Sequence, residues 1–455
     1  MSMRTSRVQI DTKTRLIVSA VLLLSTFISL GSQTMMVTAL PVISHQMHVS
    51  LNITQLLTTA YTLVIGIVTP LSSNLYEKYS NRQVYLDIIG TFIVGTLVGC
   101  FANNFYSLLL ARLIQACAGG LLMSFQMTTM ISIYPPQRRG TILGISSLVV
   151  AFGPAIGPTL SGIILNYLNW HYLFILILPL MILLWVISLF TFPNYSTPRP
   201  IKIDLVSVFE SLIGSGLALF SMSVFGYNWA VASVMLLVGI GILYIFVKRQ
   251  LRLKQPLLKV AILKERSFRL MTMVGMLAFS VLLGTEQLIP VFTENVSHVS
   301  SMESGIILLP GAIVNALCAA LVGRYYDAHG PKGLIFSGAI LMLIATIPFL
   351  TITQDTPIWL MTVAYAIRMA GNAMIFSPAM SESFVAVAHE DISHATALNN
   401  SLRQVSGAIS VTLLIVIAGL PHSLVTGMRV AIWVTVFCIL CLSVIFASYL
   451  KHKQK

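Results

Sequence analysis

The chain has 455 residues, of which 56% are hydrophobic and only 9% are charged, and its mean hydropathy is +0.89. A soluble domain carries about a quarter charged residues, so this composition excludes an ordinary water-soluble protein. The formal net charge of +13 does not require nucleic acid, because Lys and Arg gather on the cytoplasmic side of membrane proteins. We therefore expect a lipid bilayer around the chain and no nucleic-acid partner.

Apolar runs long enough to cross a bilayer recur along the whole chain. The first run is long and lacks a small-residue cleavage site, so we expect a membrane span there and not a cleaved signal peptide. The fourteen expected spans lie near residues 16–41, 52–74, 83–102, 105–128, 139–165, 171–193, 204–225, 228–247, 268–293, 304–323, 333–353, 357–380, 395–419 and 428–450.

The basic residues test this count. If both termini are cytoplasmic, 23 of the 27 Lys and Arg residues fall in inner segments, and a miscounted span would exchange the two sides for every later loop. The longest polar connection, residues 247–269, is either an amphipathic segment on the inner membrane surface or a solvated linker. The sequence thus predicts an all-α membrane protein with fourteen spans and cytoplasmic termini, in a plasma membrane that we expect to be bacterial.

Three landmarks recur in the two ends of the chain, at offsets of 249, 250 and 256 residues. These pairs are Pro41 with Pro290, Glu77 with Asp327, and Arg112 with Arg368. Spans one to six therefore match spans nine to fourteen, and spans seven and eight are inserted between them. A duplicated six-helix unit is typical of transporters that hold substrate between the two repeats.

With this repeat the chain resembles the major facilitator superfamily, and the inserted pair resembles its fourteen-span drug/proton antiporter branch of EmrB, QacA and LmrB type. The resemblance implies a monomeric major facilitator fold of two six-helix halves plus two inserted helices. The expected divisions are 1–200 for the first half, 201–250 for the inserted pair, 251–266 for a basic cytoplasmic connection and 267–455 for the second half.

The fifth expected span contains "AFGPAIGPTLSG", which resembles the antiporter motif of that superfamily. Gly153 and Gly157 are four residues apart, as are Pro154 and Pro158, and such spacing places small residues on one ridge where another helix can approach closely. Ordinary small-residue packing explains the same pattern. The resemblance implies a helix that favours exchange over leak.

The loops after spans two and ten resemble the gating motif of the superfamily. The second copy retains Asp327 and Lys332, whereas the first is degenerate and has Glu77 and Arg82. An acid in such a loop can pair with a basic group or a helix N-terminus and hold an inner gate closed. A solvated, positively charged turn is the alternative.

Charged residues inside apolar spans are expensive and are functional candidates. Arg112 matches the Arg-x-x-Gln motif that the resemblance links to proton transfer, although a scaffold role is equally open; for Arg368 and Arg403 a structural role is favoured. Ser32 stands where the branch often has an aspartate. Glu286, in span nine, is therefore the expected proton-coupling acid, the alternative being a wetted carboxylate at the outer mouth.

The resemblance implies an exporter of amphipathic, often cationic, drug-like compounds that uses the proton gradient and no cofactor. We expect Gln33, Thr34, Gln115 and Gln287 to line the substrate cavity. No phosphate-binding loop or metal-ligand spacing is present, so the chain is not expected to be an enzyme. The alternatives are a dedicated exporter of one peptide, lipid or metabolite, and a non-transporting scaffold or sensor.

Overall fold

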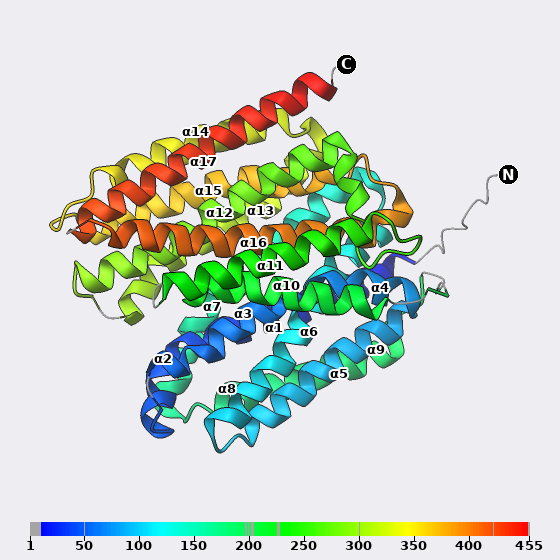
Figure 1. Cartoon of the computed structure of the whole chain (residues 1–455), viewed down its shortest axis with the longest axis horizontal. Coiled ribbons are helices and arrows are strands. Elements are labelled where there is room, and N and C mark those ends of the chain that lie inside the picture. Colours follow the sequence, from blue (N-terminus) through cyan, green and yellow to red (C-terminus); the bar gives the residue numbers. More distant parts are fainter. Residues whose placement is uncertain are drawn as a thin grey trace.

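The computed structural model of the chain describes residues 11–49, 51–195, 198, 200–201, 204–224, 228–299, 301–421 and 423–453. Long helices run side by side along one direction (Figure 1). The first set consists of α1 (Thr12–Gln46), α2 (Leu51–Thr54), α3 (Leu56–Val68), α4 (Ser72–Lys78), α5 (Asn81–Cys100), α6 (Phe105–Ile133), α7 (Arg139–Tyr167), α8 (Tyr172–Ile175) and α9 (Ile177–Thr191). We call these the N-terminal helices.

The second set, the C-terminal helices, follows an inserted pair. The pair is α10 (Leu205–Val224) and α11 (Trp229–Gln250). The C-terminal helices are α12 (Arg266–Asn295), α13 (Ser301–His329), α14 (Lys332–Leu350), α15 (Ile358–Ser383), α16 (Ile392–Gly419) and α17 (Leu424–Lys453). Short 3-10 turns are η1 (Thr69–Leu71), η2 (Pro136–Arg138), η3 (Val260–Lys264) and η4 (His389–Asp391).

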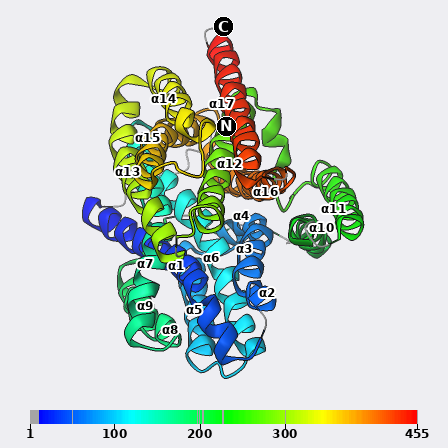
Figure 2. The same ribbon diagram turned by 90° about the vertical axis from the view of Figure 1, so that its left-hand side faces the viewer.

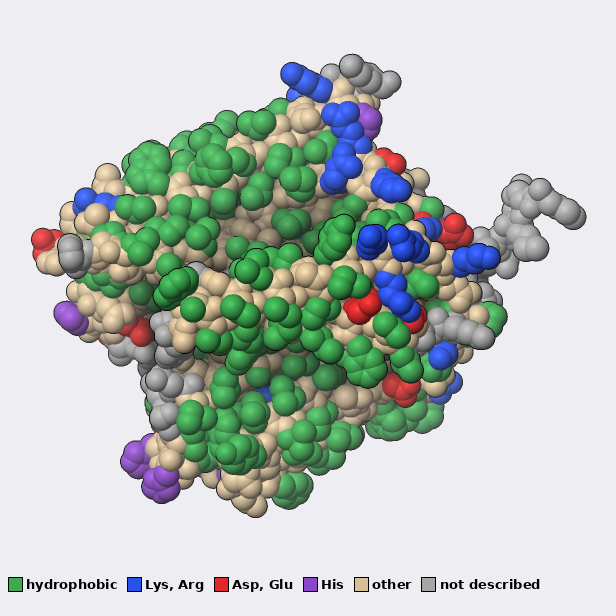
Figure 3. Space-filling model, in the orientation of Figure 1, with side chains coloured by type: hydrophobic (Ala, Val, Ile, Leu, Met, Phe, Trp, Pro, Cys, Tyr) green, Lys and Arg blue, Asp and Glu red, His purple; other side chains and the backbone are tan. Residues whose placement is uncertain are grey.

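Twelve of the described helices are long and apolar enough to cross a membrane. The two remaining expected spans correspond to α7 and α10. Within the described residues their apolar stretches, 139–150 and 205–221, are too short to be counted with these twelve. Fourteen spans therefore stay a prediction. Exposed Leu, Ile, Val and Phe side chains cover the flank of the bundle, as membrane lipid requires (Figure 3).

Local sequence sets several helix boundaries. The side chains of Ser80 and Asn104 accept hydrogen bonds from backbone amides at the start of α5 and α6, which satisfies donors that the first helical turn leaves free. Between α3 and α4 the second apolar run is interrupted by η1, where Pro70 has no amide hydrogen to donate. The expected second span is thus one helical segment, Leu56–Lys78, with a 3-10 turn inside it.

The packing of the two helix sets repeats. α1 packs on α7 as α12 packs on α16, and α5 packs on α6 as α14 packs on α15. α3 contacts α6 as α13 contacts α15, and α1 and α12 each contain an internal proline, Pro41 and Pro290. Figure 2 looks along the bundle, with the C-terminal helices above, the N-terminal helices below and α10 and α11 to one side.

Both described chain ends lie at the same end of the bundle, where α1 begins and α17 ends (Figure 1). Most Lys and Arg side chains on the face drawn in Figure 3 also lie there. We call it the basic end and the opposite one the far end. The connection after α11 packs here against protein: Leu257 and Leu258 are buried, and Lys259 forms a 2.7 Å ion pair with Asp391.

Candidate functional site

Asp327, near the end of α13, contacts the first turn of α7 at the basic end. Its carboxylate accepts hydrogen bonds from the backbone amides of Gly140 and Thr141, both at 2.7 Å, and from the Thr141 hydroxyl at 2.5 Å. The N-terminus of a helix carries a partial positive charge, so an anion is stabilised there. A C-terminal helix is thereby joined to an N-terminal one.

Glu77, at the end of α4, makes the reciprocal contact. Its carboxylate accepts a 2.9 Å hydrogen bond from the Ser393 hydroxyl and lies 3.2 Å from Nε2 of His394, both in the first turn of α16. The two copies of the expected gating motif therefore each place an acid on the first turn of a helix from the other set.

The backbones of α7 and α13 also touch beside Asp327. A methyl group added to Gly144 would lie 3.0 Å from the Cα atom of Gly323, and one added to Gly323 would overlap the carbonyl of Gly140. Only glycine permits this approach of two main chains. The helix sets are therefore closed against each other at the basic end.

The two basic residues expected in the gating loops lie outside these contacts. The Arg82 guanidinium donates to the carbonyl of Leu189, and its backbone amide donates to Asn194 at 3.2 Å. Arg82 therefore joins two N-terminal helices. The Lys332 side chain is exposed at the start of α14.

The glycine ridge of α7 faces α1. A methyl group on Gly153 would lie 3.0 Å from Cβ of Leu30, and one on Gly157 would overlap the hydroxyl of Thr34. The motif thus packs within the N-terminal helices, and α7 meets α13 through its earlier glycines. Pro158 lies on the same helix, and the side chain of Pro154 lies outside the described residues.

Arg112 is buried on α6 and is held by neutral groups. Its guanidinium donates to the carbonyls of Ser32 and Gln33, each at 3.3 Å, and to the Gln115 side chain at 2.9 Å. It also lies 4.0 Å from the centroid of the Tyr61 ring, a favourable cation–π distance. Arg112 therefore ties α6 to the first span at the position of the missing aspartate.

Arg368 is its counterpart on α15. It donates to the hydroxyls of Thr346 and Thr435 at 2.7 and 2.8 Å. Tyr365, one turn away on α15, is also buried. The Glu286 side chain is half-buried on α12, and among the described residues its carboxylate accepts no hydrogen bond.

The four polar residues expected in the substrate cavity have different surroundings. Gln115 is fully buried and also donates to Thr96 at 2.9 Å, so it supports Arg112. Gln33 donates to Thr62 at 3.3 Å, and Thr34 packs beside Gly157. Gln287 is exposed on α12.

A small pocket lies between the two helix sets toward the basic end. It encloses about 20 Å³ and is lined by Met123, Gln126, Met127, Ser146, Ser147, Val150, Phe376, Met380, Asn400 and Arg403. Such a volume is near that of one ordered water. The sequence favoured a structural role for Arg403 and did not predict this pocket, because its lining combines α6 and α7 with α15 and α16, which are far away in the chain.

Glu382 is a buried acid that the sequence did not single out. It lies at the end of α15, only 1% exposed, and accepts hydrogen bonds from Tyr326 at 2.5 Å and from Tyr449 and Lys453. Glu382 follows Arg368 by 14 residues, about four helical turns, so helical periodicity places both on one face. This spacing is the feature of the sequence that could have indicated a buried Glu382.

Comparisons with known proteins agree with this architecture. Residues 22–411 match the model of the Major Facilitator Superfamily. The chain is 37% identical over 404 residues to the Uncharacterized MFS-type transporter YcnB of Bacillus subtilis, covering 88% of this chain and 86% of that protein. It is 33% identical over 393 residues to the Lincomycin resistance protein LmrB of the same organism, covering 85% and 82%.

A solved structure shows the same fold. The human organic anion transporter MFSD10 superposes with a TM-score of 0.70 and 14% identity, covering 93% of this chain and 99% of that one. The family match spans most of the chain, and its apolar helices have the length to cross a bilayer. The chain therefore belongs to the Major Facilitator Superfamily and is a multi-pass membrane transporter.

Proposed function

We propose that the protein is a proton-coupled efflux transporter that exports amphipathic small molecules by alternating access. It acts as a monomer in the bacterial plasma membrane, with fourteen spans and the basic end in the cytoplasm. The N-terminal and C-terminal helices are its two moving halves, divided by the α10–α11 pair. Inner-side Lys and Arg support this orientation.

The reciprocal placement of Asp327 and Glu77 is the observation that carries the proposal. Each acid contacts the first turn of a helix in the opposite half. These contacts break when the halves separate at the basic end, so they act as a two-part latch on the inner gate. The present arrangement is the inward-closed member of the cycle.

Glu286 is the proposed proton site. It is the half-buried acid of the span that repeats span one, and it accepts no hydrogen bond from the described residues. A carboxylate with few partners in an apolar span changes its protonation readily when its surroundings change. Alternating exposure of Glu286 would couple proton entry to substrate exit.

Export of drug-like compounds is proposed from the relatives. The name of the relative LmrB connects that protein with lincomycin resistance, and a transporter with this architecture can protect a cell by removing an inhibitor. A dedicated exporter of one solute is the second candidate. A panel of growth inhibitors separates the two, because a broad exporter protects against several unrelated compounds.

The deciding experiment uses cells that express the wild-type protein or an Asp327→Asn variant at equal membrane abundance. Wild-type cells should grow at higher concentrations of at least one compound, and inside-out vesicles should accumulate it when a proton gradient is imposed. Dissipating the gradient should abolish accumulation. Protection without gradient-dependent accumulation would reject proton-coupled export.

A further inference from the structure

We propose that the pocket between the halves binds the anionic group of the exported compound, such as a carboxylate or sulfonate, and that Arg403 is the residue that holds it. This inference rests on the proposed export function and narrows its substrate class. It differs from the cationic class expected from the family resemblance. Arg403, its partners and the lining of the pocket carry the argument.

Arg403 has unused hydrogen-bonding capacity. Its side chain is 2% exposed, one terminal nitrogen donates to Asn400 at 3.0 Å, the other contacts the sulfur of Met380, and Nε has no partner. A guanidinium has five N–H donors, and a thioether is a weak acceptor. Among the described residues Arg403 forms no ion pair, so its charge has no counterion in that part of the chain.

The other two buried arginines differ in their surroundings. Arg112 is held by three oxygen acceptors and the Tyr61 ring, and Arg368 by two hydroxyls. Neither lines the pocket between the halves, whereas Arg403 does. Arg403 lies where the two halves meet, so its side chain can contact a compound that passes between them.

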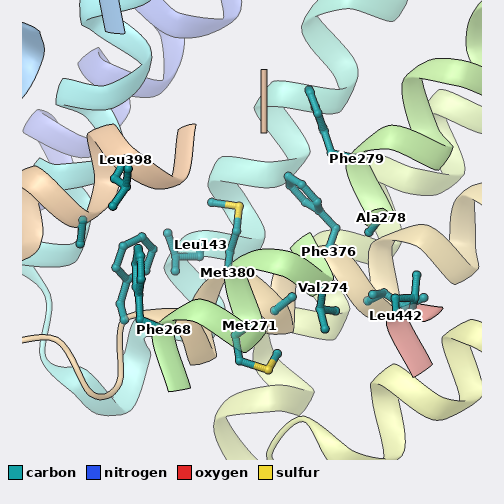
Figure 4. Packing of buried hydrophobic residues seen from close by; sticks show 14 of the residues in the cluster. Leu143, Phe268, Met271, Val274, Ala278, Phe279, Phe376, Met380, Leu398 and Leu442 are labelled. Carbon is teal, nitrogen blue, oxygen red and sulfur yellow. The ribbon is translucent and has the colours of Figure 1, made fainter. Parts of the chain in front are cut away.

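The pocket lining favours an anion attached to an apolar body. It contains no Asp or Glu, so Arg403 is its one charged member. The Arg403 guanidinium lies 5.3 and 4.8 Å from the ring centroids of Phe279 and Phe376, which stack at 6.0 Å. Figure 4 shows these two rings near Met380. Aromatic and methionine side chains adapt to apolar groups of different shape.

The pocket is placed to load from the basic end. Asn400 of α16 donates to Ser124 of α6 at 3.1 Å, so this contact crosses between the halves. When the halves separate there, Asn400 is released and the pocket widens from its closed volume. Arg403 and Asn400 then present N–H donors to a compound that enters from the proposed cytoplasmic side.

Three probes that share the dansyl fluorophore test the charge preference. Dansylglycine carries a carboxylate, dansylglycinamide is neutral, and dansylcadaverine carries an ammonium group. Binding to the purified full-length protein in detergent is measured by fluorescence anisotropy. Dansylglycine should bind about tenfold more tightly than either of the others, as a charge-assisted hydrogen bond predicts.

Variants of the pocket identify the residue responsible. Arg403→Gln should remove the tenfold preference, and Arg403→Lys should retain part of it. Asn400→Asp supplies the guanidinium with a counterion at nearly unchanged shape, so it should remove the preference even if Arg403→Gln does not fold. Arg429→Gln is the matched control, because Arg429 donates to the Ile352 carbonyl outside the pocket and its loss removes one positive charge as well.

Three results would overturn the proposal. They are absence of dansylglycine binding, equal or tighter binding of the amide or amine, and an anion preference that persists in Arg403→Gln or Asn400→Asp. The assay needs no transport, so its failure is distinct from failure of the export function. If the protein binds the anion selectively but exports no compound, the proposed export function is rejected and the proposed anion site is retained.

Discussion

The carboxylate of Asp327 and the backbone amide of Gly140 lie 2.7 Å apart across the boundary between the two halves. One oxygen of Asp327 serves Gly140 and the other serves Thr141. Oε1 of Glu77 accepts from the Ser393 hydroxyl and lies 3.2 Å from Nε2 of His394. The two acids occupy matching places but differ in their partners, because Asp327 accepts from two backbone amides and Glu77 contacts the side chains of Ser393 and His394.

This difference predicts unequal effects of removing the charges. Asp327→Asn replaces one acceptor oxygen with an NH₂ group that faces another donor, a loss of about 1–3 kcal/mol. Glu77→Gln keeps a carbonyl oxygen that can still accept from the Ser393 hydroxyl. At matched membrane abundance, vesicle transport should therefore fall about tenfold in Asp327→Asn and much less in Glu77→Gln. An equal or reversed effect would contradict this account of the latch.

The ridge of α7 gives a second prediction. Gly157→Leu places a side chain against Thr34, and even its Cβ atom would lie 2.7 Å from the carbonyl oxygen of Gly31. Overpacking of this kind costs about 1–3 kcal/mol. Transport should be lost and the melting temperature should fall. Gly162→Leu on the same helix is the control, because a methyl group there meets nothing within 4 Å; full transport by Gly157→Leu would reject close packing.

Glu286→Gln should uncouple transport from the proton gradient. The amide keeps the size of the side chain and cannot titrate. In vesicles the variant should still bind a neutral substrate and lose accumulation against a concentration gradient. Substrate affinity in wild type should vary with pH, and the variant should flatten that dependence.

Glu210→Gln serves as the control for this experiment, because Glu210 lies on the inserted α10. It should leave coupling intact. Uphill, pH-dependent export by the Glu286→Gln variant would place the proton site at another acid.

The loop before α10 gives a pH prediction. Arg249 donates to Asp204 at 2.7 Å and holds the pKa of this carboxyl at about 2, below the ordinary 3.8. A lowered folded-state pKa stabilises the protein above the unfolded value, and the contribution disappears as pH falls toward 2. The melting-temperature difference between wild type and Asp204→Asn should be constant from pH 7 to 5 and shrink below about pH 4. A difference that grows with acid would contradict the ion pair.

Glu382 should stabilise the C-terminal half. It joins Tyr326 of α13 to Tyr449 and Lys453 of α17. Glu382→Gln leaves these donors with a weaker acceptor, so the melting temperature in detergent should fall, by an amount equivalent to about 1–3 kcal/mol. Glu390→Gln, in the exposed turn after α15, should leave it unchanged. Equal stability of the two variants would show that Glu382 is not structurally important.

The helices were predictable because bilayer thickness imposes a length on apolar runs. α5, expected at 83–102, spans Asn81–Cys100, and α16, expected at 395–419, spans Ile392–Gly419. The 3-10 turn at η1 was not predicted, since Pro70 lies within an apolar run whose length alone indicates a regular α-helix. The connection expected on lipid or in solvent instead buries Leu257 and Leu258, because its core partners come from elsewhere in the chain.

The site was less predictable, because side-chain partners depend on which helix faces meet. Arg112 stands out in an apolar run, yet its partners Ser32 and Tyr61 follow only from the packing of three helices. Glu382 was overlooked because it follows the apolar run and resembles a loop residue. Its burial depends on Tyr449 and Lys453, about 70 residues later in the chain.

The α10–α11 pair lies across the seam of the protein. α10 packs on α3 of one half and on α16 of the other, and it meets α3 through Leu219 against Gly66 and Gly216 against Ile67. If the halves rock as proposed, a third body that touches both must travel with one and slide over the other. Smooth contacts through glycine suit such a sliding surface. On this flank the pair also separates the boundary between the halves from the surrounding lipid. A solute dissolved in the bilayer therefore meets a covered boundary on this flank and one without the pair on the other.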